Sequence, residues 1–204
     1  MSEEIVSRLQ ERFTEITPRE SLDWPAVNCP ARQWADLAAA LREEYGYRFL
    51  MDVSGVDWKE EAPRFMVVYH LFSTRKHAYL RVAVACPEDK EPEVPSVVKV
   101  WPTADWHERE TYDMFGIRFR GHPELKRILM WEDYPFHPLR KEFPLAGWET
   151  ELPDREVAEQ TGAKVIGAPM MGGPFVAPDE GPMSEREPRA RDETWTEKNP
   201  KPKK

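Results

Sequence analysis

Cysteine and glycine are scarce in this sequence of 204 residues, which contains two cysteines and ten glycines. Cys29 and Cys86 lie far apart and form no CxxC pair. The chain therefore lacks a disulfide framework and the set of about four cysteines that an iron–sulfur cluster normally needs. No GxGxxG or GxxxxGK motif occurs, which argues against the usual phosphate-binding loops of nucleotide enzymes. The sparse cysteines indicate a reducing, cytoplasmic compartment.

Long apolar runs and an excess of basic charge are also missing. No stretch approaches the roughly 18 consecutive apolar residues of a bilayer-spanning helix, and the charged N-terminus does not resemble a secretory signal. Any attachment to a membrane is therefore expected to run through partners. The net charge is −8 at pH 7. An acidic chain without a long basic stripe argues against nucleic-acid binding and favours a protein-binding surface.

Helix and strand patterns fill the first 120 residues. Apolar residues at helical spacing predict helices over residues 2–13 and 30–45. Apolar runs between short polar loops predict an antiparallel meander of strands at 49–56, 65–72 and 78–86. A fourth, weaker run at 24–28 is restricted by Pro25 to a sheet edge or a strand start.

The apolar patterns of two of these strands also predict how each is covered in the sheet. The run at 65–72 is apolar on both alternations and is expected to be covered on both sides. The run at 78–86 alternates with Tyr79 and Arg81 and is expected at an edge or with one wet face. A charged helix follows, with Asp105 and Glu108 spaced as a capping box and Gly116 beyond its end.

This order of elements packs most simply as helices laid on one face of a sheet. We predict an α+β fold, a two-layer α/β sandwich whose mixed sheet is mostly antiparallel, followed by a long extended C-terminal arm. Periodicity fades after residue 120, and 12 of the 20 prolines fall in the last 84 residues. The predicted parts are an α/β body over 1–120, an extended partner-docking arm over 121–150 and a Pro-rich tail over 151–204 that is loose from Pro182.

Five histidines raise the possibility of a metal-dependent enzyme. No two are three or four residues apart, so a zinc site would need His107, His122 and His137 to converge from separate segments, with Glu108 or Glu110 beside them. The spacing argues against such a site. His70, inside a strand pattern, is better explained as a hydrogen-bonded core side chain, and His77 as a solvated loop residue.

A cluster of carboxylates lies on the predicted helix before Gly116. Glu108, Glu110 and Asp113 could form an acid/base group. The more economical interpretation is a solvated helix face with a surface ion pair between Arg109 and Asp113. Because the apolar residues of this helix are spread around it and form no single stripe, it is a poor core helix and a fair partner-binding one.

A run of short motifs covers residues 108–145. The segment ERETYDMFGI begins at Glu108, and it is followed by GHP from Gly121, RIL from Arg127, HPLRK from His137 and an aromatic-Pro-Leu. This order closely resembles the signature of the C-type subunit of the proton-pumping NADH:quinone oxidoreductase, the thirty-kilodalton subunit family of respiratory complex I. Weaker resemblance at 49–57, 67–71 and 94–102 extends it over residues 24–145. Phe136 and Glu142 depart from the common Gly and Asp of the family.

The resemblance implies a structural and assembly subunit of the peripheral arm, which has no catalytic residue, metal or cofactor of its own. The complex, a translocase of the respiratory electron-transport chain, uses NADH, FMN, iron–sulfur clusters and quinone. The implied partners are the large quinone-pocket subunit and neighbouring iron–sulfur subunits, at the cytoplasmic face of the inner membrane. The implied partner contacts are Glu108, Arg109, Glu110, Tyr112, Asp113, Gly116, Gly121, His122, Pro123, Trp131, His137, Pro138, Leu139, Arg140 and Lys141.

Several alternatives stay open at the level of sequence. Related membrane hydrogenases, coenzyme F420 dehydrogenases and ferredoxin:quinone complexes use similar subunits, so the resemblance leaves the electron donor open. From other classes, the alternatives are a stand-alone histidine–metal enzyme and a soluble binding module outside any membrane complex.

Overall fold

The computed structural model describes residues 2–59, 62–143, 148 and 150–165. The chain divides into two compact units, Met1–Lys141 and Glu142–Lys204. The first unit therefore includes most of the segment that composition assigned to a docking arm. The expected loose stretch from Pro182 lies outside the described residues.

The first unit begins with a helix, and its two later helices are separated by runs of strands. Its elements are α1 (Ser2–Arg12), β1 (Thr17–Arg19), β2 (Ala26–Pro30), α2 (Ala31–Glu43), β3 (Phe49–Asp57), β4 (Phe65–Ser73), β5 (Ala78–Ala85), β6 (Glu93–Pro95), α3 (Ala104–Phe115) and β7 (Arg118–Arg120). The predicted helices and the three predicted strands of the meander are all present, with ends shifted by a few residues.

The main sheet has five strands in the order β1-β2-β5-β4-β3. Strands β3, β4 and β5 form the predicted antiparallel meander, and β2 joins it parallel to β5. Of the two alternatives for the 78–86 run, the edge position is wrong, because β2 pairs along its free side, and the partly wet face is confirmed, because Tyr79 and Arg81 are only half-buried. For the 24–28 run the edge alternative is wrong, because β2 pairs on both sides, and the strand-start alternative is confirmed, because Pro25 stands directly before the first residue of β2. A separate two-stranded sheet joins β6 to β7 in parallel.

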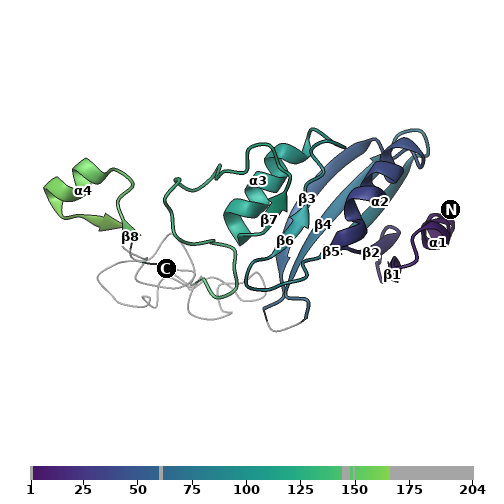
Figure 1. Cartoon of the computed structure of the whole chain (residues 1–204), viewed down its shortest axis with the longest axis horizontal. Coiled ribbons are helices and arrows are strands. Elements are labelled where there is room, and N and C mark those ends of the chain that lie inside the picture. The colour runs from purple at the N-terminus through teal and green to yellow at the C-terminus, as the bar shows by residue number, and fades with distance from the viewer. Residues whose placement is uncertain (1, 60–61, 144–147, 149, 166–204) are drawn as a thin grey trace, which may run out of the picture. The chain divides into compact units, whose positions relative to one another are not determined.

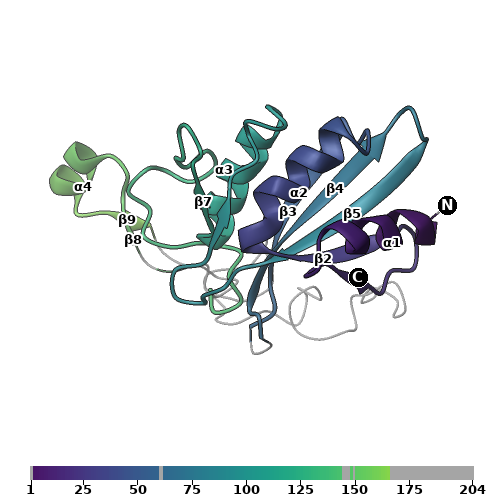
Figure 2. The same cartoon turned by 45° about the vertical axis from the view of Figure 1, so that its right-hand side comes forward.

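Helices α2 and α3 cover the same face of the sheet, as Figures 1 and 2 show. Trp34 of α2 packs on Tyr69 of β4, with ring centroids 4.3 Å apart. Phe115 of α3 packs over Gly55 of β3, which is paired with Val67. Paired residues point to one face, so both helices cover the side that carries the core. The predicted α+β sandwich with helices on one face is confirmed.

The core lies between this face and the helices. It is formed by fully buried side chains from α1, α2, β4 and β5 together with the loop before α3, among them Leu9, Trp34, Leu41, Phe65, Val67, Leu71, Leu80, Val82 and Trp101. The Trp101 indole Nε1 donates a hydrogen bond to the Tyr47 carbonyl at 3.1 Å. This bond joins the segment after α2 to the loop that leads into α3.

The opposite face of the sheet is only partly covered. Val68, His70 and Phe72 of β4 are half-buried, so the expectation of cover on both sides is wrong. Arg81 Nε donates to His70 Nε2 at 2.9 Å, and Trp24 stacks on Tyr79 at 4.4 Å. His70 is hydrogen-bonded as predicted, but on this polar and aromatic face and not in the core.

The described part of the second unit is a small hairpin-like element. Strands β8 (Thr150–Glu151) and β9 (Lys164–Val165) pair antiparallel around α4 (Arg155–Thr161). Asp154 caps α4 by accepting hydrogen bonds from the backbone N–H groups of Glu156 and Val157. Sequence periodicity did not predict this helix, because seven residues are too few to show it. Over the described ranges, no helix has the length and apolar character needed to cross a bilayer.

Replacing Gly55 by alanine should separate α3 from β3. A Cβ at this position would lie 2.5 Å from Phe115 Cδ2, so the ring or the helix must shift. We expect Gly55→Ala to lower the free energy of unfolding by about 1–3 kcal/mol, the usual cost of overpacking. Urea unfolding of the full-length chain measures it, and Met51→Ala on the same strand, at a half-exposed side chain, is the control. Equal stability of Gly55→Ala and the natural chain would contradict this packing.

Candidate partner-binding site

Helix α3 has two covered faces. Thr111 donates to the Val53 carbonyl at 3.5 Å, and Glu108 Oε1 accepts from the Val97 N–H at 2.7 Å, so this side faces the sheet and the loop before the helix. The other side, with Asp113, faces residues 121–141, which we name the strap. The predicted capping box is wrong because Glu108 bonds to Val97, and Thr103 is the N-cap without a side-chain bond.

Asp113 holds the strap through one buried carboxylate. Its Oδ2 accepts hydrogen bonds from three successive backbone N–H groups, those of Ile128 (3.0 Å), Leu129 (2.7 Å) and Met130 (2.9 Å). Its Oδ1 accepts from Arg127 Nη1 at 2.6 Å. The side chain is fully buried. Burial alone raises the pKa of this group, but the bonds from Met130, Leu129 and Arg127 outweigh it, and the pKa of Asp113 is lowered.

Arg127 extends this anchor along the strap. Its Nη2 donates to the carbonyls of Tyr134 (2.6 Å) and Phe136 (3.1 Å), while Nη1 also reaches the Asp113 carbonyl at 3.2 Å. One guanidinium therefore fixes a helix end and two points of the strap, which its planar fork of donors allows. The predicted ion pair of Asp113 with Arg109 is wrong. Arg109 is buried, donates to the Lys126 carbonyl at 3.3 Å and lies over the Trp106 ring.

A second buried carboxylate holds the end of the strap. Asp57, the last residue of β3, accepts two bonds from Arg64 at 2.9 Å each and one from the Lys141 N–H at 2.8 Å. The Lys59 N–H adds a fourth bond at 2.8 Å. Burial would raise the pKa of Asp57, but these bonds lower it to about 2. The carboxylate thus stays charged and couples the sheet to the strap.

Gly116 lets the strap approach the end of α3. Its backbone is left-handed, with φ of +72°, and it caps the helix. A Cβ here would lie 2.5 Å from Arg140 Nη2 and 2.6 Å from His137 Nε2, so no side chain fits. Arg140 Nε donates to the Phe115 carbonyl at 2.6 Å, and the Leu139 N–H to the Met114 carbonyl at 3.0 Å. The HPLRK residues thus close over the helix terminus of their own chain.

Two histidines fasten the strap with defined tautomers. His137 Nδ1 lies 2.8 Å from the Asp113 carbonyl, which only accepts, so Nδ1 carries the proton. Burial lowers the pKa of His137 and keeps the ring neutral. His122 Nδ1 accepts from the Glu124 N–H at 3.0 Å, so its Nε2 carries the proton toward the Asp105 carbonyl at 3.3 Å. Both imidazole rings therefore form hydrogen bonds within the chain that hold the strap against α3.

His107, His122 and His137 do not converge on one site. His107 instead lies near Asp52, 3.8 Å from its carboxylate. Within the described ranges, no group of three or more His, Cys, Asp or Glu side chains is arranged to hold a metal ion. Cys29 and Cys86 are buried, and burial raises the pKa of both thiols to about 12, which disfavours the thiolate that a cluster needs.

The predicted contact residues fall into three groups by exposure. Glu108, Arg109, Asp113 and Gly116 are buried and serve the internal network. Tyr112, His122, Trp131, His137, Pro138 and Arg140 are half-buried, and Glu110, Gly121, Pro123, Leu139 and Lys141 are exposed. Sequence reasoning missed Arg127 and Asp57 as functional positions. A basic residue in a nonperiodic apolar segment that follows a helix with surplus carboxylates is the signal that could have pointed to Arg127.

Exposed apolar side chains mark the outer surface of the same region. Leu139 of the strap is 53% exposed, Leu129 is 60% exposed and Trp106 of α3 is 64% exposed. The backbone beneath the two leucines is fixed by the bonds to Met114 and Asp113. A rigid surface with exposed leucine and tryptophan next to the charges of Glu110 and Lys141 suits protein binding better than catalysis.

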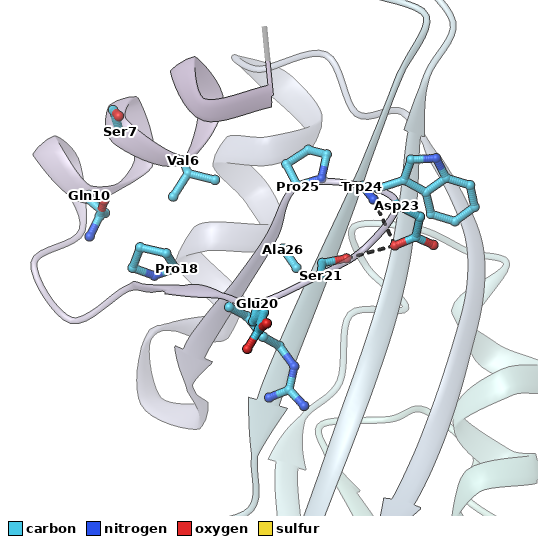
Figure 3. Close-up of a pocket in the computed structure, with 11 residues that line it drawn as sticks. Val6, Ser7, Gln10, Pro18, Glu20, Ser21, Asp23, Trp24, Pro25 and Ala26 are labelled. Carbon is cyan, nitrogen blue, oxygen red and sulfur yellow. Dashed lines mark hydrogen bonds between the residues drawn. The ribbon is translucent and has the colours of Figure 1, made fainter.

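An open groove of about 590 Å³ lies elsewhere on the first unit, between α1 and the segment leading into β2. Figure 3 shows Val6 and Gln10 of α1 facing Pro18 and the loop that follows. Its carboxylate Asp23 accepts from Ser21 and from the Trp24 N–H, both at 2.8 Å. The hydrogen bond from Ser21 has the largest effect, and together with the bond from Trp24 it lowers the pKa of Asp23 to about 2. Asp23 is therefore unsuited to acid/base chemistry near neutral pH.

Removing the charge of Asp113 should release the strap. We expect Asp113→Asn to lower the free energy of unfolding by about 3–5 kcal/mol, because Arg127 keeps a buried charge without its partner. Urea unfolding of the full-length chain measures the loss. Glu110→Gln, on the exposed side of the same helix, is the matched control and should change stability by less than about 0.5 kcal/mol. Similar stabilities of the two variants would contradict the anchoring role.

Glu108 should make stability depend on pH. Burial raises the pKa of this carboxyl from 4.5 to about 7, with a smaller increase from the Asp105 charge, while the Ser96 hydroxyl and the Val97 N–H act in the opposite direction. A raised pKa means that the folded state holds the proton more tightly. The stability contributed by Glu108 is thus fully present below pH 4.5 and is lost as pH rises through about 7.

Comparison of the natural chain with Glu108→Gln isolates this effect. As pH rises from 4.5 to above 7, the natural chain should lose on the order of 3 kcal/mol of unfolding free energy relative to Glu108→Gln. Chemical unfolding across this range measures it. The exposed Glu110→Gln should follow the natural profile, and parallel profiles for all three chains would refute a protonated Glu108.

The part of the chain that contains α3 and the strap is similar in sequence to known proteins. Residues 27–149 match the model of the respiratory-chain NADH dehydrogenase, 30 Kd subunit family. The second C-type subunit of the NADH-quinone oxidoreductase of Rhizobium etli is 43% identical over 150 residues, which cover 72% of this chain and 78% of that protein. The C-type subunit of the NADH-quinone oxidoreductase of Moorella thermoacetica is 44% identical over 140 residues, which cover 69% of this chain and 93% of that protein.

A solved structure shows the same fold. A chain of the membrane-bound sulfane sulfur reductase, an archaeal respiratory membrane complex, superposes with a TM-score of 0.60 at 23% identity, covering 79% of this chain and 91% of that chain. The family match includes α3 and the whole strap, where the motif residues form the network described above. The chain therefore belongs to the 30 Kd subunit family of the respiratory-chain NADH dehydrogenase.

Proposed function

We propose that this chain is a structural and assembly subunit in the peripheral arm of a proton-pumping NADH:quinone oxidoreductase. The observation that carries the proposal is the sequence match over residues 27–149, supported by relatives that are C-type subunits of NADH-quinone oxidoreductases. These relatives favour NADH as the electron donor of the complex over the donors of hydrogenase, F420 or ferredoxin complexes. The complex performs the redox chemistry, and this chain supplies a binding surface at the cytoplasmic face of the membrane.

The docking surface that we propose is the outer side of the strap and α3. Leu129 and Leu139 are exposed although their backbone is fixed from within by Asp113 and Met114. A surface that is ordered before binding loses little conformational entropy when a partner covers it. The partner contacts are therefore assigned to the exposed members of the predicted set, with the large quinone-pocket subunit and neighbouring iron–sulfur subunits as partners.

The cofactors of the complex, NADH, FMN, iron–sulfur clusters and quinone, are assigned to the other subunits. The two thiols of this chain do not fit a cluster, because both are buried and a cluster normally needs about four cysteine ligands. The complex therefore needs this chain for its assembly, and its catalytic activity requires the chain for that reason.

Charged substitutions on the proposed surface test this function. We expect Leu129→Asp combined with Leu139→Asp to prevent incorporation into the membrane complex, because each aspartate would be desolvated at the interface. The measurement is co-purification of tagged full-length chain with the complex from membranes, together with NADH:quinone oxidoreductase activity of those membranes. Both should fall at least tenfold, while the unfolding midpoint of the isolated chain should change little.

The matched control is Leu22→Asp. Leu22 is fully exposed and lies outside the family match, so its replacement should leave assembly unchanged. Normal incorporation of the double variant would disprove the assigned surface. Co-purification of the natural chain with no other member of such a complex would disprove the proposed function itself.

A further inference from the structure

Aromatic side chains form a row on the face of the main sheet opposite to α2 and α3, which we name the open face. Phe49 of β3 pairs with Phe72 of β4, and Phe72 pairs with Tyr79 of β5. Because Leu71 lies in the core, its neighbour Phe72 and the two residues paired with it point to the open face. The Phe72 and Tyr79 rings lie 4.6 Å apart, and Trp24 stacks on Tyr79. We name these four aromatic residues the aromatic row.

The aromatic row is most exposed at its two ends. Phe49 is 50% exposed and Trp24 is 39% exposed. Met51, the extra residue where the pairing of β3 with β4 shifts register, is also half exposed. Neighbouring large apolar side chains that stay exposed commonly mark a surface to which another molecule binds. Trp and Tyr are well suited to such a surface, because they bring a large contact area at a small cost in conformational entropy.

Three exposed basic side chains lie at one end of the aromatic row, and we name Arg48, Arg75 and Lys76 the basic cluster. Arg48 directly precedes β3, and the other two lie in the turn between β4 and β5. The two segments are neighbours, because a Cβ on Gly46 would lie 3.7 Å from Ser73 Oγ. The row and the cluster therefore form one continuous surface.

The charge of the basic cluster is not balanced by nearby acids. Within the part of the chain that the structure describes, the side chains of Arg48 and Arg75 form no ion pair or hydrogen bond. Glu43 and Glu44, the acids that precede Arg48 most closely in sequence, pair with arginines of α2 and α1. The cluster thus leaves two guanidinium groups available in a chain whose net charge is −8.

Two carboxylates on or beside the open face also have partners. Asp23 pairs with Arg81 at 3.1 Å. Asp52 accepts a hydrogen bond from Ser54 Oγ at 2.6 Å and lies 3.5 Å from His70. These carboxylates therefore do not neutralise the basic cluster.

We propose that the aromatic row and the basic cluster bind an acidic segment of a partner protein. An apolar side chain of that segment lies on the rings, and its carboxylates pair with the cluster. A guanidinium presents a planar fork of donors that matches a carboxylate, and aromatic residues and arginine are enriched in protein interfaces. A short segment meets only the cluster, whereas a membrane or a nucleic acid would also meet the acidic remainder of the chain.

This surface goes beyond the proposed function. It lies on the face of the sheet that α3 does not cover, so it is separate from the surface of the strap and α3. Aspartates at Leu129 and Leu139 should leave it intact. The two surfaces can therefore fail or succeed independently.

Binding of a defined peptide tests the chemistry. The probe is a short fluorescent peptide with one tryptophan among aspartates and glutamates, and its anisotropy is measured with the full-length chain at low salt. We expect Arg75→Glu to weaken binding at least about fivefold. Lys90→Glu, the same change of net charge in the exposed loop after β5, is the matched control and should leave binding unchanged. Replacing the tryptophan of the peptide by serine should also weaken binding.

Two results of this experiment would overturn the proposal. One is equal binding of the peptide to the natural chain and to Arg75→Glu. The other is binding of the natural chain to phosphatidylglycerol vesicles or to single-stranded DNA without binding of the peptide.

Carbodiimide cross-linking in membranes that contain the tagged chain tests the site in its assembly. This reagent joins an amine to a carboxylate that it touches, so we expect a link from Lys76 to an Asp or Glu of another polypeptide. Lys76→Arg should lose the link and keep that polypeptide during purification, while Lys76→Glu should lose both. A link from Lys76 only to its own chain, or no link in the assembled protein, would refute the site. The peptide experiment decides the matter if the chain enters no assembly.

Discussion

A single buried carboxylate organises the carboxyl-terminal part of the first unit. Asp113 accepts three consecutive backbone N–H groups and an arginine, and that arginine holds two further carbonyls of the strap. Hydrogen bonds to a charged acceptor are roughly twice as strong as neutral ones and are least screened where water is excluded. A segment with no helix, strand or core of its own thereby acquires a defined course over α3.

A similar anchor holds the far end of the strap, where Asp57 accepts the Lys141 N–H. Between the two anchors, Gly116 brings the backbone close enough for Arg140 to reach the Phe115 carbonyl. The motifs that are separate in sequence thus form one network around the end of α3. The polar atoms of the network point into the molecule, and the leucine side chains point outward. The internal hydrogen bonds therefore hold the proposed binding surface in place.

Sequence patterns predicted the helices, the meander and the fold class, because alternation and helical spacing are local properties. They did not predict that β2 pairs with β5, which depends on contacts between distant segments. They also placed Glu108 and Asp113 on a solvated face, since spacing cannot show that a charged residue meets a partner from a later segment. The family resemblance selected the HPLRK residues as partner contacts, and the structure gives several of them hydrogen-bond partners within the chain.

The parallel pairing of β2 with β5 has a consequence for synthesis. A ribosome releases β2 and α2 well before β5, and β5 is the strand that separates β2 from the rest of the sheet. Until β5 emerges, β2 can pair only with the short β1 on one side, and its other edge and the apolar side of α2 have no sheet to join. The nascent chain therefore carries a strand with one unpaired edge through the synthesis of the whole meander, a period in which that edge is open to aggregation and to chaperones.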